Sequence, residues 1–345
     1  MTRSLTGLPF DDVRGLLDAL PDPDMEAVEK VRARDRVLTK PAGALGRLEE
    51  IVECMAAWTS KAPPRVTRPM VAIFASAHGV TRRGVSAYPD AVNRAMLENF
   101  AAGGAAINQL CVANGIGLKV FDLAIDMPTP DIAAEPAMSE KDCAATIAFG
   151  MEAVAGGTDL LCVGEMGIGN TTIAAAIHAA LWGGGGAAWV GPGTGVDAAG
   201  VARKAAVVDA ALATHAGHLS DPLEVLRRVG GREIAAICGA ILAARYERVP
   251  VLLDGYVTTA AAAVLHALEP SSIAHCMAAH RSAEPAHGKA LEKLGLTPIL
   301  DLGMRLGEGS GAALAVGVVK AALACHQGMA TFEQANVPTA RSDLQ

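Results

Sequence analysis

The chain has 345 residues, a formal net charge of −7 and a sequence pI of about 5.7. This acidic balance argues against a nucleic-acid or membrane-surface partner, because both attract a basic patch. The seven cysteines are odd in number and include no C-x-x-C pair, which indicates a reduced, cytoplasmic protein rather than a disulfide framework or a zinc site. We expect no signal peptide and no apolar stretch of the roughly 20 residues that a membrane span needs.

Short apolar runs predict the strands. They lack the alternation of a half-exposed strand, which favours strands buried on both faces of a sheet. The predicted strands are residues 70–75, 118–122, 159–163, 187–190, 249–253, 272–277 and 297–301.

Helical segments lie between most of these runs. They cover residues 91–113, 141–155, 171–182, 200–216, 232–245, 258–268 and 284–294. This alternation predicts an α/β fold, a Rossmann-like three-layer protein with a parallel sheet and helices on both faces. Ligands are expected beyond the carboxyl ends of the strands.

The two ends of the chain differ from this middle. Residues 23–60 have the pattern of charged amphipathic helix interrupted by TKPAGALGRLEE, and residues 309–335 that of one long helix with a tail. We expect the ends to form a small helical subdomain beside the sheet. The predicted parts are 1–65 and 309–345 for this subdomain and 66–308 for the α/β domain.

The stretch AHGVTRRGVSAYP follows the first predicted strand, so it forms a loop at the ligand edge of the sheet. Ser86 and Tyr88 are candidates to line a pocket there. The alternative is a tight turn made by Gly79 and Gly84 with no contact to a ligand.

The stretch GEMGIGNTT (164–172) joins a predicted strand to a predicted helix. Its glycines at 164 and 169 have the spacing of a Walker A loop, but Asn170 stands where the phosphate-binding lysine is expected. Glycine allows close backbone approach to an anion, and a helix start offers free N–H groups. The missing lysine argues against a triphosphate site and favours a monophosphate. A degenerate P-loop NTPase and a non-catalytic nucleotide-binding protein remain alternatives.

A second glycine turn, GPGTGVDAAGVARK, covers residues 191–204. Lys204 lies too far along its helix to be a P-loop lysine, but it can supply a positive charge to a phosphate held between the two turns. Each turn alone could be a packing turn between helix and sheet. Two in succession, each with added polar groups, favour phosphate binding.

Glu308 lies between Gly307 and Gly309, where a predicted strand meets the last helix. Such a carboxylate can be a helix cap or dipole partner. The flanking glycines leave it free to face a ligand, and Met304 and Leu306 provide an apolar wall that disfavours its charged form. Those features suit a general base near neutral pH.

Three further acids, Glu165, Glu233 and Asp254, stand at the same edge of the predicted sheet. Each could equally be a cap or a solvated acid.

Taken together, these motifs resemble the nicotinate-nucleotide–dimethylbenzimidazole phosphoribosyltransferase family, which builds the lower-ligand nucleotide of cobalamin. The resemblance extends from about residue 35 to 336, and nine motifs in the family's order make it specific. The motifs are KPAGALGRLEE, HGVTRRGVSAYP, GGAAIN, GEMGIGNTT, GPGTGVDAAGVARK, GGREIAA, LLDGYVTTAAA, AHRSAEPAH and LDLGMRLGEGSGAALA.

The resemblance implies transfer of the phosphoribosyl group of nicotinate mononucleotide to 5,6-dimethylbenzimidazole, with inversion at C1′. It makes Glu308 the general base and Glu165 and Asp254 supporting acids, and it implies a homodimer without cofactor or metal. The implied phosphate site consists of Gly167, Gly169, Asn170, Thr171, Gly193, Thr194, Gly195 and Lys204. Ser86, Tyr88, Ser282 and Leu306 form the implied base pocket.

The chain departs from the expected family pattern on the loop that should contact the incoming base. Ala77 stands where an acidic residue is expected, and Asp90 and Asn93 belong to a PDAVN segment in place of a version with Gln and Thr. These departures leave the details of base recognition open.

Overall fold

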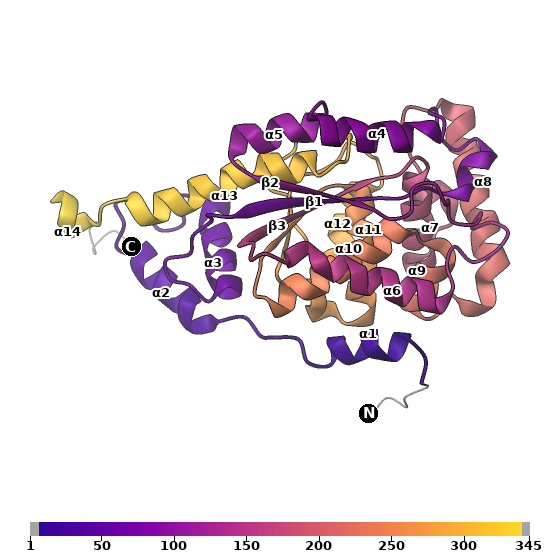
Figure 1. Ribbon diagram of the computed structural model, residues 1–345. Coiled ribbons are helices and arrows are strands. Elements are labelled where there is room, and N and C mark those ends of the chain that lie inside the picture. The colour runs from indigo at the N-terminus through magenta and orange to yellow at the C-terminus, as the bar shows by residue number, and fades with distance from the viewer. Residues whose placement is uncertain (1–6, 340–345) are drawn as a thin grey trace.

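Five parallel strands form the centre of the computed structural model, which describes residues 7–339 (Figure 1). Their order in the sheet is β2-β1-β3-β4-β5. The chain runs outward from β1 to β2 and then returns to the other side of β1 with β3. A doubly wound sheet of this order binds ligands at the switch point between β1 and β3. The strands are β1 (Pro69–Ala75), β2 (Gly117–Asp122), β3 (Leu160–Met166), β4 (Val251–Leu253) and β5 (Cys276–Ala278).

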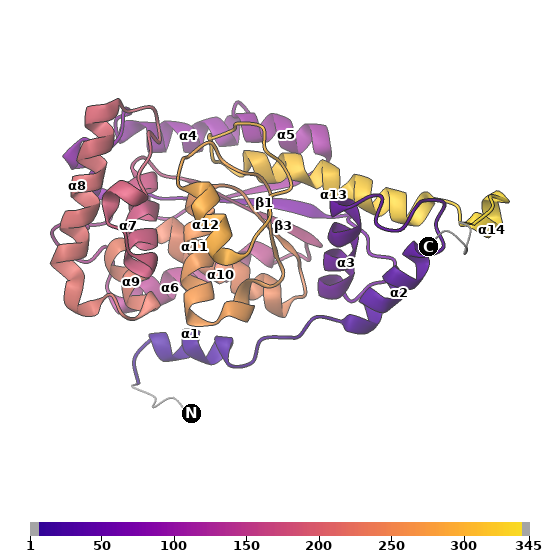
Figure 2. The same ribbon diagram turned by 180° about the vertical axis from the view of Figure 1, so that it is seen from behind.

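Strands β1, β3, β4 and β5 are buried along most of their length because both faces of the sheet are covered, whereas β2, at the edge of the sheet, has no fully buried residue. In β1, Ala72 and Phe74 pack into the core on one face, while Val71 and Ile73 pack into the core on the other. Helices on both faces confirm the predicted α/β three-layer fold (Figures 1 and 2).

One core contains α4 (Ala91–Ala102), α5 (Ala106–Asn114) and α13 (Ser310–Gly328). The other contains α6 (Glu140–Gly150), α7 (Asn170–Trp182), α8 (Ala198–His215), α9 (Pro222–Val229), α10 (Arg232–Tyr246), α11 (Tyr256–Leu268) and α12 (His287–Leu294). Of these, α9 was not among the predicted helices.

The strand predicted at 187–190 is wrong. Three glycines with positive φ, Gly183 to Gly185, turn the chain, and a 3-10 turn at Gly186–Ala188 follows. Trp189 then packs against the rings of His178 and Trp182. The apolar residues of this segment therefore fill an aromatic cluster instead of extending the sheet.

The last predicted strand, 297–301, forms only part of a pairing. The N–H groups of Ile299 and Leu300 donate to the carbonyls of Ala278 and Ala279, both at 3.0 Å. A single bridge between His280 and Leu300 results, because Pro298 has no N–H to continue the ladder.

Other boundaries also differ from the predictions, for example α6, which ends at Gly150 instead of 155. Helix 91–113 is divided into α4 and α5, because Gly103 adopts a φ of +79°. The strand predicted at 272–277 starts later, since Pro270–Ile273 forms a 3-10 turn before β5. The helix predicted at 284–294 begins at His287.

Both ends of the chain contribute helices that lie beside the sheet (Figures 1 and 2). Helices α2 (Met25–Asp35) and α3 (Arg47–Thr59) pack with the C-terminal half of α13. The guanidinium of Arg34 donates to the carbonyls of His326 and Gln327 at 2.8 and 2.9 Å, which ties α2 to the end of α13. A short helix, α14 (Phe332–Ala335), follows.

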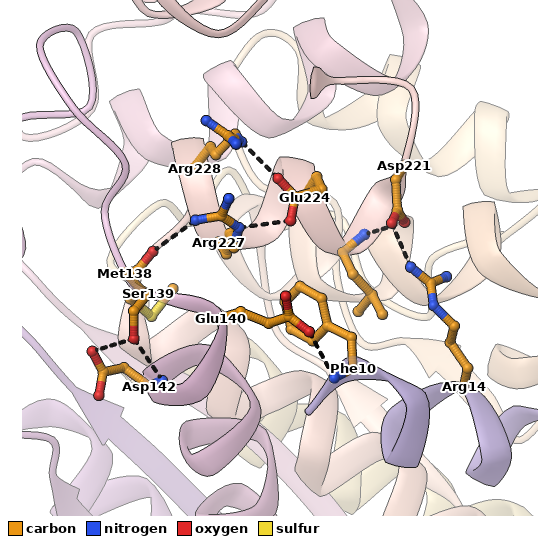
Figure 3. Close-up of polar contacts among 11 residues, drawn as sticks. Phe10, Arg14, Met138, Ser139, Glu140, Asp142, Asp221, Glu224, Arg227 and Arg228 are labelled. Atoms are coloured by element: carbon orange, nitrogen blue, oxygen red, sulfur yellow. Dashed lines mark hydrogen bonds and ion pairs between the residues drawn. The ribbon is translucent and has the colours of Figure 1, made fainter. Parts of the chain in front are cut away.

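Helix α1 (Phe10–Leu17) lies apart from α2 and α3, on the layer that contains α6 and α9 (Figure 3). The N–H of Phe10 donates to the Glu140 carboxylate at 3.0 Å, and Arg14 pairs with Asp221. The division at residues 65/66 and 308/309 therefore stays a proposal, in which α1 would belong with the larger domain.

Helix α13 differs from the expectation that no apolar stretch is long enough to span a membrane. Within residues 7–339 it is the one helix long and apolar enough to cross a bilayer by length and composition. Half of that window is buried inside the protein, against the sheet and neighbouring helices. A core helix of an α/β protein meets the same criterion.

Candidate active site

A pocket of about 620 Å³ opens where β1, β3, β4 and β5 end. Its position beyond the carboxyl ends of the strands is the one expected from the fold. Ten of the predicted site residues line it: Tyr88, Glu165, Gly167, Asn170, Thr171, Gly193, Thr194, Ser282, Leu306 and Glu308. The other five, Ser86, Gly169, Gly195, Lys204 and Asp254, are not part of this lining.

The first glycine turn connects the end of β3 at Met166 to the start of α7 at Asn170. Gly169 adopts a φ of +92°, which places the chain in the left-handed region just before the helix. The side-chain amide of Asn170 donates to the Glu165 carboxylate. Asn170 thus holds an acid of the pocket as well as standing at the helix start.

The second glycine turn has two neighbours that the sequence did not predict. The N–H of Gly193 donates to Glu284 Oε1 at 2.6 Å, and its carbonyl accepts from the guanidinium of Arg305 at 2.7 Å. Both Glu284 and Arg305 line the pocket. An anion that binds at the Gly193 N–H would therefore have to displace the Glu284 carboxylate.

Lys204 joins the two turns from beneath the pocket. Its Nζ donates to Thr171 Oγ1 at 2.9 Å and to the carbonyl of Gly191 at 2.8 Å. The side chain is fully buried, and this burial lowers the pKa of the ammonium to about 8, although the nearby Glu284 carboxylate acts in the opposite direction. Lys204 therefore orders Thr171 and the second turn and provides its charge from below.

Glu308 has a strained backbone, with a φ of +62° between Gly307 at +84° and Gly309 at +77°. A residue other than glycine seldom adopts this conformation, and such strain is frequent at functional sites. Three consecutive residues in the left-handed region turn the Glu308 side chain toward the pocket. Gly164 makes this turn possible, because a Cβ there would lie 2.5 Å from the nitrogen of Gly309.

The carboxyl group of Glu308 is buried and incompletely bonded. Its Oε2 has no hydrogen-bond partner among the described residues. Burial raises the pKa of this group, and the N–H of Ile107 at the start of α5 opposes the rise. The oxygen is thus placed to accept a proton from a ligand.

Asp254, not Glu308, caps the last helix. Its carboxylate accepts from the N–H groups of Gly309 at 3.2 Å and Ala312 at 3.0 Å. Burial raises the pKa of Asp254 to about 7, although these backbone bonds lower it. The cap interpretation considered for Glu308 therefore applies to its neighbour, and Asp254 fixes the backbone that carries Glu308.

Glu165 is a half-buried carboxyl group that also lines the pocket. Burial raises its pKa to about 8, Asp254 adds to the rise, and the hydrogen bond from Asn170 opposes it. The folded protein therefore holds a proton on Glu165 more tightly than an ordinary glutamate would.

The predicted base-pocket residues come from three separate segments. Tyr88 and Leu306 lie at the mouth, with relative exposures of 56% and 57%, and Ser282 follows β5. Ser86 Oγ lies 3.1 Å from Thr194 Oγ1, so its loop contacts the second glycine turn. The predicted apolar wall is formed by Leu306 with Val92, Met96 and Met166, because Met304 is not part of the lining.

Several lining residues were missed by the sequence prediction. Arg305 and Glu284 belong to motifs already quoted, LDLGMRLGEGSG and AHRSAEPAH, so charge within those motifs was the available signal. Val92 and Met96 lie four residues apart on α4, which places them on one helix face. Two apolar residues at this spacing do not indicate a ligand site in a sequence. The other lining residues that were not predicted are Met166, Ile168, Gly255, Tyr256, Val257, His280 and Gly307.

Comparisons with known proteins agree with this geometry. A family model described as phosphoribosyltransferase matches residues 20–337. The nicotinate-nucleotide–dimethylbenzimidazole phosphoribosyltransferase of Rhizobium rhizogenes is 68% identical over 334 residues, which are 97% of this chain and 98% of that protein. Its counterpart in Agrobacterium fabrum is 66% identical over 336 residues, 97% of each chain.

Solved structures give the same result. The crystal structure of the protein of that name from Thermus thermophilus has a TM-score of 0.85 and 40% sequence identity, and the match covers 92% of this chain and 100% of that one. A second structure, titled CobT and from the same organism, has a TM-score of 0.86 and 41% identity.

The fold and the pocket define a doubly wound α/β enzyme whose ligand site lies at the switch point of the sheet, with two glycine turns and the buried carboxyl groups of Asp254, Glu284 and Glu308. The chain belongs to the phosphoribosyltransferase family of the proteins just described, which confirms the resemblance seen in the sequence.

Proposed function

We propose that this protein transfers the 5-phosphoribosyl group of nicotinate mononucleotide to 5,6-dimethylbenzimidazole, giving α-ribazole 5′-phosphate and nicotinate in cobalamin biosynthesis. The names of relatives that are 66–68% identical over almost the whole chain support the substrates. The observation in the structure that carries the chemistry is Glu308, a buried carboxyl group of the pocket lining whose Oε2 has no hydrogen-bond partner among the described residues.

The reaction needs one base and no acid. The C1′–N bond to nicotinate breaks with its electron pair moving to the ring nitrogen, which is cationic before the break and therefore leaves without a proton. One nitrogen of the benzimidazole attacks C1′ from the opposite face, which inverts the anomeric configuration. Its second nitrogen loses a proton, which Glu308 accepts.

The phosphate of the nucleotide would bind between the two glycine turns. Thr171 supports this position, because its Oγ1 accepts from Lys204 and keeps its own hydrogen to donate. Gly167, Gly169, Asn170, Gly193, Thr194 and Gly195 form the remainder of the proposed phosphate site. Holding the phosphate fixes the ribose, so orientation is the second contribution to catalysis.

The aromatic base would lie against the apolar wall formed by Val92, Met96, Met166 and Leu306. Tyr88, Ser282 and Ser86 border this region. Glu165 and Asp254 act as supporting acids, Asp254 by fixing the backbone of Glu308. Ala77, Asp90 and Asn93, which depart from the expected pattern, are not part of the pocket lining, and Asn93 accepts from the N–H of Ile168 in the first glycine turn at 2.8 Å.

Of the alternatives, a P-loop NTPase without the Walker lysine is not favoured, since the whole-chain comparisons identify a phosphoribosyltransferase. We further propose a cytoplasmic homodimer without membrane or nucleic-acid partners, on the basis of the family resemblance and the net charge of −7. Sedimentation would test the homodimer.

The test of the reaction is chromatography of the products formed from nicotinate mononucleotide and 5,6-dimethylbenzimidazole without added metal. Equimolar α-ribazole 5′-phosphate and nicotinate are expected. Binding of the nucleotide without release of nicotinate would indicate a non-catalytic nucleotide-binding protein. Hydrolysis of ATP that requires magnesium would instead support the NTPase.

A further inference from the structure

A buried polar cluster lies behind the first glycine turn, outside the pocket lining. Ser76 and His78 follow β1, and Glu233 stands in the first turn of α10. The side chain of His78 contacts Glu233 through Nε2 and Oε1 at 2.8 Å, and Ser76 Oγ donates to the other carboxylate oxygen. The side chains of His78 and Glu233 are fully buried.

This cluster is in direct contact with the backbone of the turn. A Cβ added to Gly167 would lie 3.0 Å from His78 Nε2 and 3.1 Å from the carbonyl oxygen of Ser76. The N–H of Ser76 donates to the carbonyl of Met166 at 2.9 Å. The first glycine turn therefore rests on the His78 ring.

A second glycine confines the same ring from behind. A Cβ at Gly231 would lie 2.5 Å from His78 Cε1. The backbone of His78 is held as well, by a parallel bridge to Thr129. The imidazole thus lies between the backbones of Gly167 and Gly231 and has little freedom to move.

The carboxylate form of Glu233 is favoured despite its position. Burial raises its pKa most strongly, but His78 and the hydrogen bonds from His78 and Ser76 together lower it below the ordinary value. Glu233 also lies at the start of a long helix, where a negative charge is stabilised. His78 Nδ1 has no partner among the described residues, so the bond through Nε2 is the polar contact that fixes the ring.

We propose that His78 and Glu233 are positioning residues for nucleotide binding, which hold the backbone of the first glycine turn in the geometry that receives the phosphate. This inference rests on the phosphate site proposed above. A buried polar pair seldom stabilises a fold better than apolar residues of the same volume, whereas a binding site needs a fixed backbone. The pair touches no substrate and acts through Gly167.

The test compares His78→Leu with His78→Gln in steady-state kinetics with nicotinate mononucleotide as the varied substrate. His78→Leu leaves Glu233 without its main partner, and the KM for the nucleotide is expected to rise at least about tenfold while kcat changes by less than about threefold. His78→Gln retains an amide that can donate to Glu233, so its KM is expected within about threefold of the wild type.

His275→Leu is the matched control. His275 is also a fully buried histidine, and its Nε2 lies 3.0 Å from the carbonyl of Ile241. It directly precedes β5, so it lies at the amino-terminal ends of the strands, away from the pocket. This variant is expected to lose stability with an unchanged KM. Equal effects of His78→Leu and His275→Leu on KM would overturn the proposal, because both would then be purely structural.

Gly231→Ala provides a second route if His78→Leu does not fold. The added methyl would collide with both the His78 ring and the Glu233 carboxylate, so nucleotide affinity measured by calorimetry should fall by a similar factor. Thr171→Val tests the phosphate site separately. If Thr171→Val weakens binding and the His78 and Gly231 variants do not, the positioning role is wrong; if none of them does, the phosphate site is wrong.

Discussion

Glu308 shows how one residue gains a function from its surroundings. Its charge suggests either a helix cap or a base, and the backbone decides between them. Because Asp254 already caps α13, the Glu308 carboxyl group is left with an oxygen that no described residue binds. Flanking glycines permit the left-handed conformation with which Glu308 joins the pocket lining.

Replacement of Glu308 by Gln should reduce kcat by roughly 10²–10⁴-fold, the usual contribution of a general base. The amide keeps the shape of the side chain but cannot accept the proton, so KM values should change little. Burial raises the pKa of the wild-type carboxyl group, and only its ionised form is active. The wild-type rate should therefore fall as the pH drops through this raised pKa.

The pH profile of Glu308→Gln is the decisive control. The variant should lack the acid limb that belongs to Glu308. Near-normal turnover, or an unchanged acid limb, would move the search for the base to Glu165 or Asp254.

Lys204 is a second residue whose role depends on its surroundings, because its side chain lies beneath the pocket. Lys204→Met keeps most of the buried volume and removes the charge that bridges Thr171 and Gly191. Loss of a charge-assisted contact costs about 1.5–3 kcal/mol, so the KM for nicotinate mononucleotide should rise roughly 10- to 100-fold, with a smaller effect on kcat. Lys289→Met, at an exposed lysine above the Trp189 ring, is the control and should leave that KM unchanged.

Among the elements, α1 is the clearest case of a segment held by tertiary contacts. Its residues Phe10, Val13 and Leu17 are buried in the core shared with α6 and α9. The polar contacts in Figure 3 fix the helix at both ends. No residue of α1 belongs to the pocket lining, so this helix contributes to stability rather than to chemistry.

Phe10→Ala should lower the free energy of unfolding by about 3–5 kcal/mol, the usual result of deleting a buried phenylalanine side chain. Urea denaturation measures this difference, and kcat/KM of the folded enzyme should stay at the wild-type value. Val112→Ala, at a side chain that is 83% exposed, should change the unfolding free energy by less than about 0.5 kcal/mol. A comparable loss in both variants would contradict the assigned packing.

At the scale of the whole molecule, the carboxyl groups of the site make the free energy of unfolding depend on pH. Burial raises the pKa of Glu165 to about 8 and that of Asp254 to about 7. A carboxyl group with a raised pKa binds its proton more tightly when folded, so its favourable contribution is complete below the unfolded pKa and is lost as the pH rises through the folded value.

The stabilising contribution of Glu165 and Asp254 should therefore be lost as the pH rises through about 7 to 8. At lower pH the buried His178, His275 and His287, whose pKa values burial lowers to about 3, act in the opposite direction, because they add stability as the pH rises toward their ordinary pKa. Glu165→Gln removes one of the titrating groups, so its unfolding free energy should depend less steeply on pH between about 7 and 8. Urea titrations at several pH values measure the slope. The exposed Glu152→Gln is the control; a slope equal to that of the wild type in Glu165→Gln would show that Glu165 does not titrate as described.

Much of the architecture was determined by the sequence. Continuously apolar runs can be buried only on both faces of a sheet, so they predicted β1, β2 and β3 and the layers around them. The predictions failed where local pattern and tertiary packing conflict. The 187–190 segment has strand composition, but the preceding glycines turn the chain so that Trp189 packs against other aromatic rings. Gly103 likewise interrupts a segment that was predicted as one helix.

Many residues of the pocket lining could also be predicted from the sequence, because glycine turns and isolated carboxylates at strand ends have few purely structural roles. The contacts that each of these residues makes could not be predicted from the sequence. Only the folded chain decides that Asp254 caps α13, that Asn170 binds Glu165, and that Glu284 and Arg305 hold Gly193. The physical reason is that hydrogen bonding and burial depend on neighbours that are distant in sequence. The separation of 91 residues between Gly193 and Glu284 leaves no local signal of the bond that joins them.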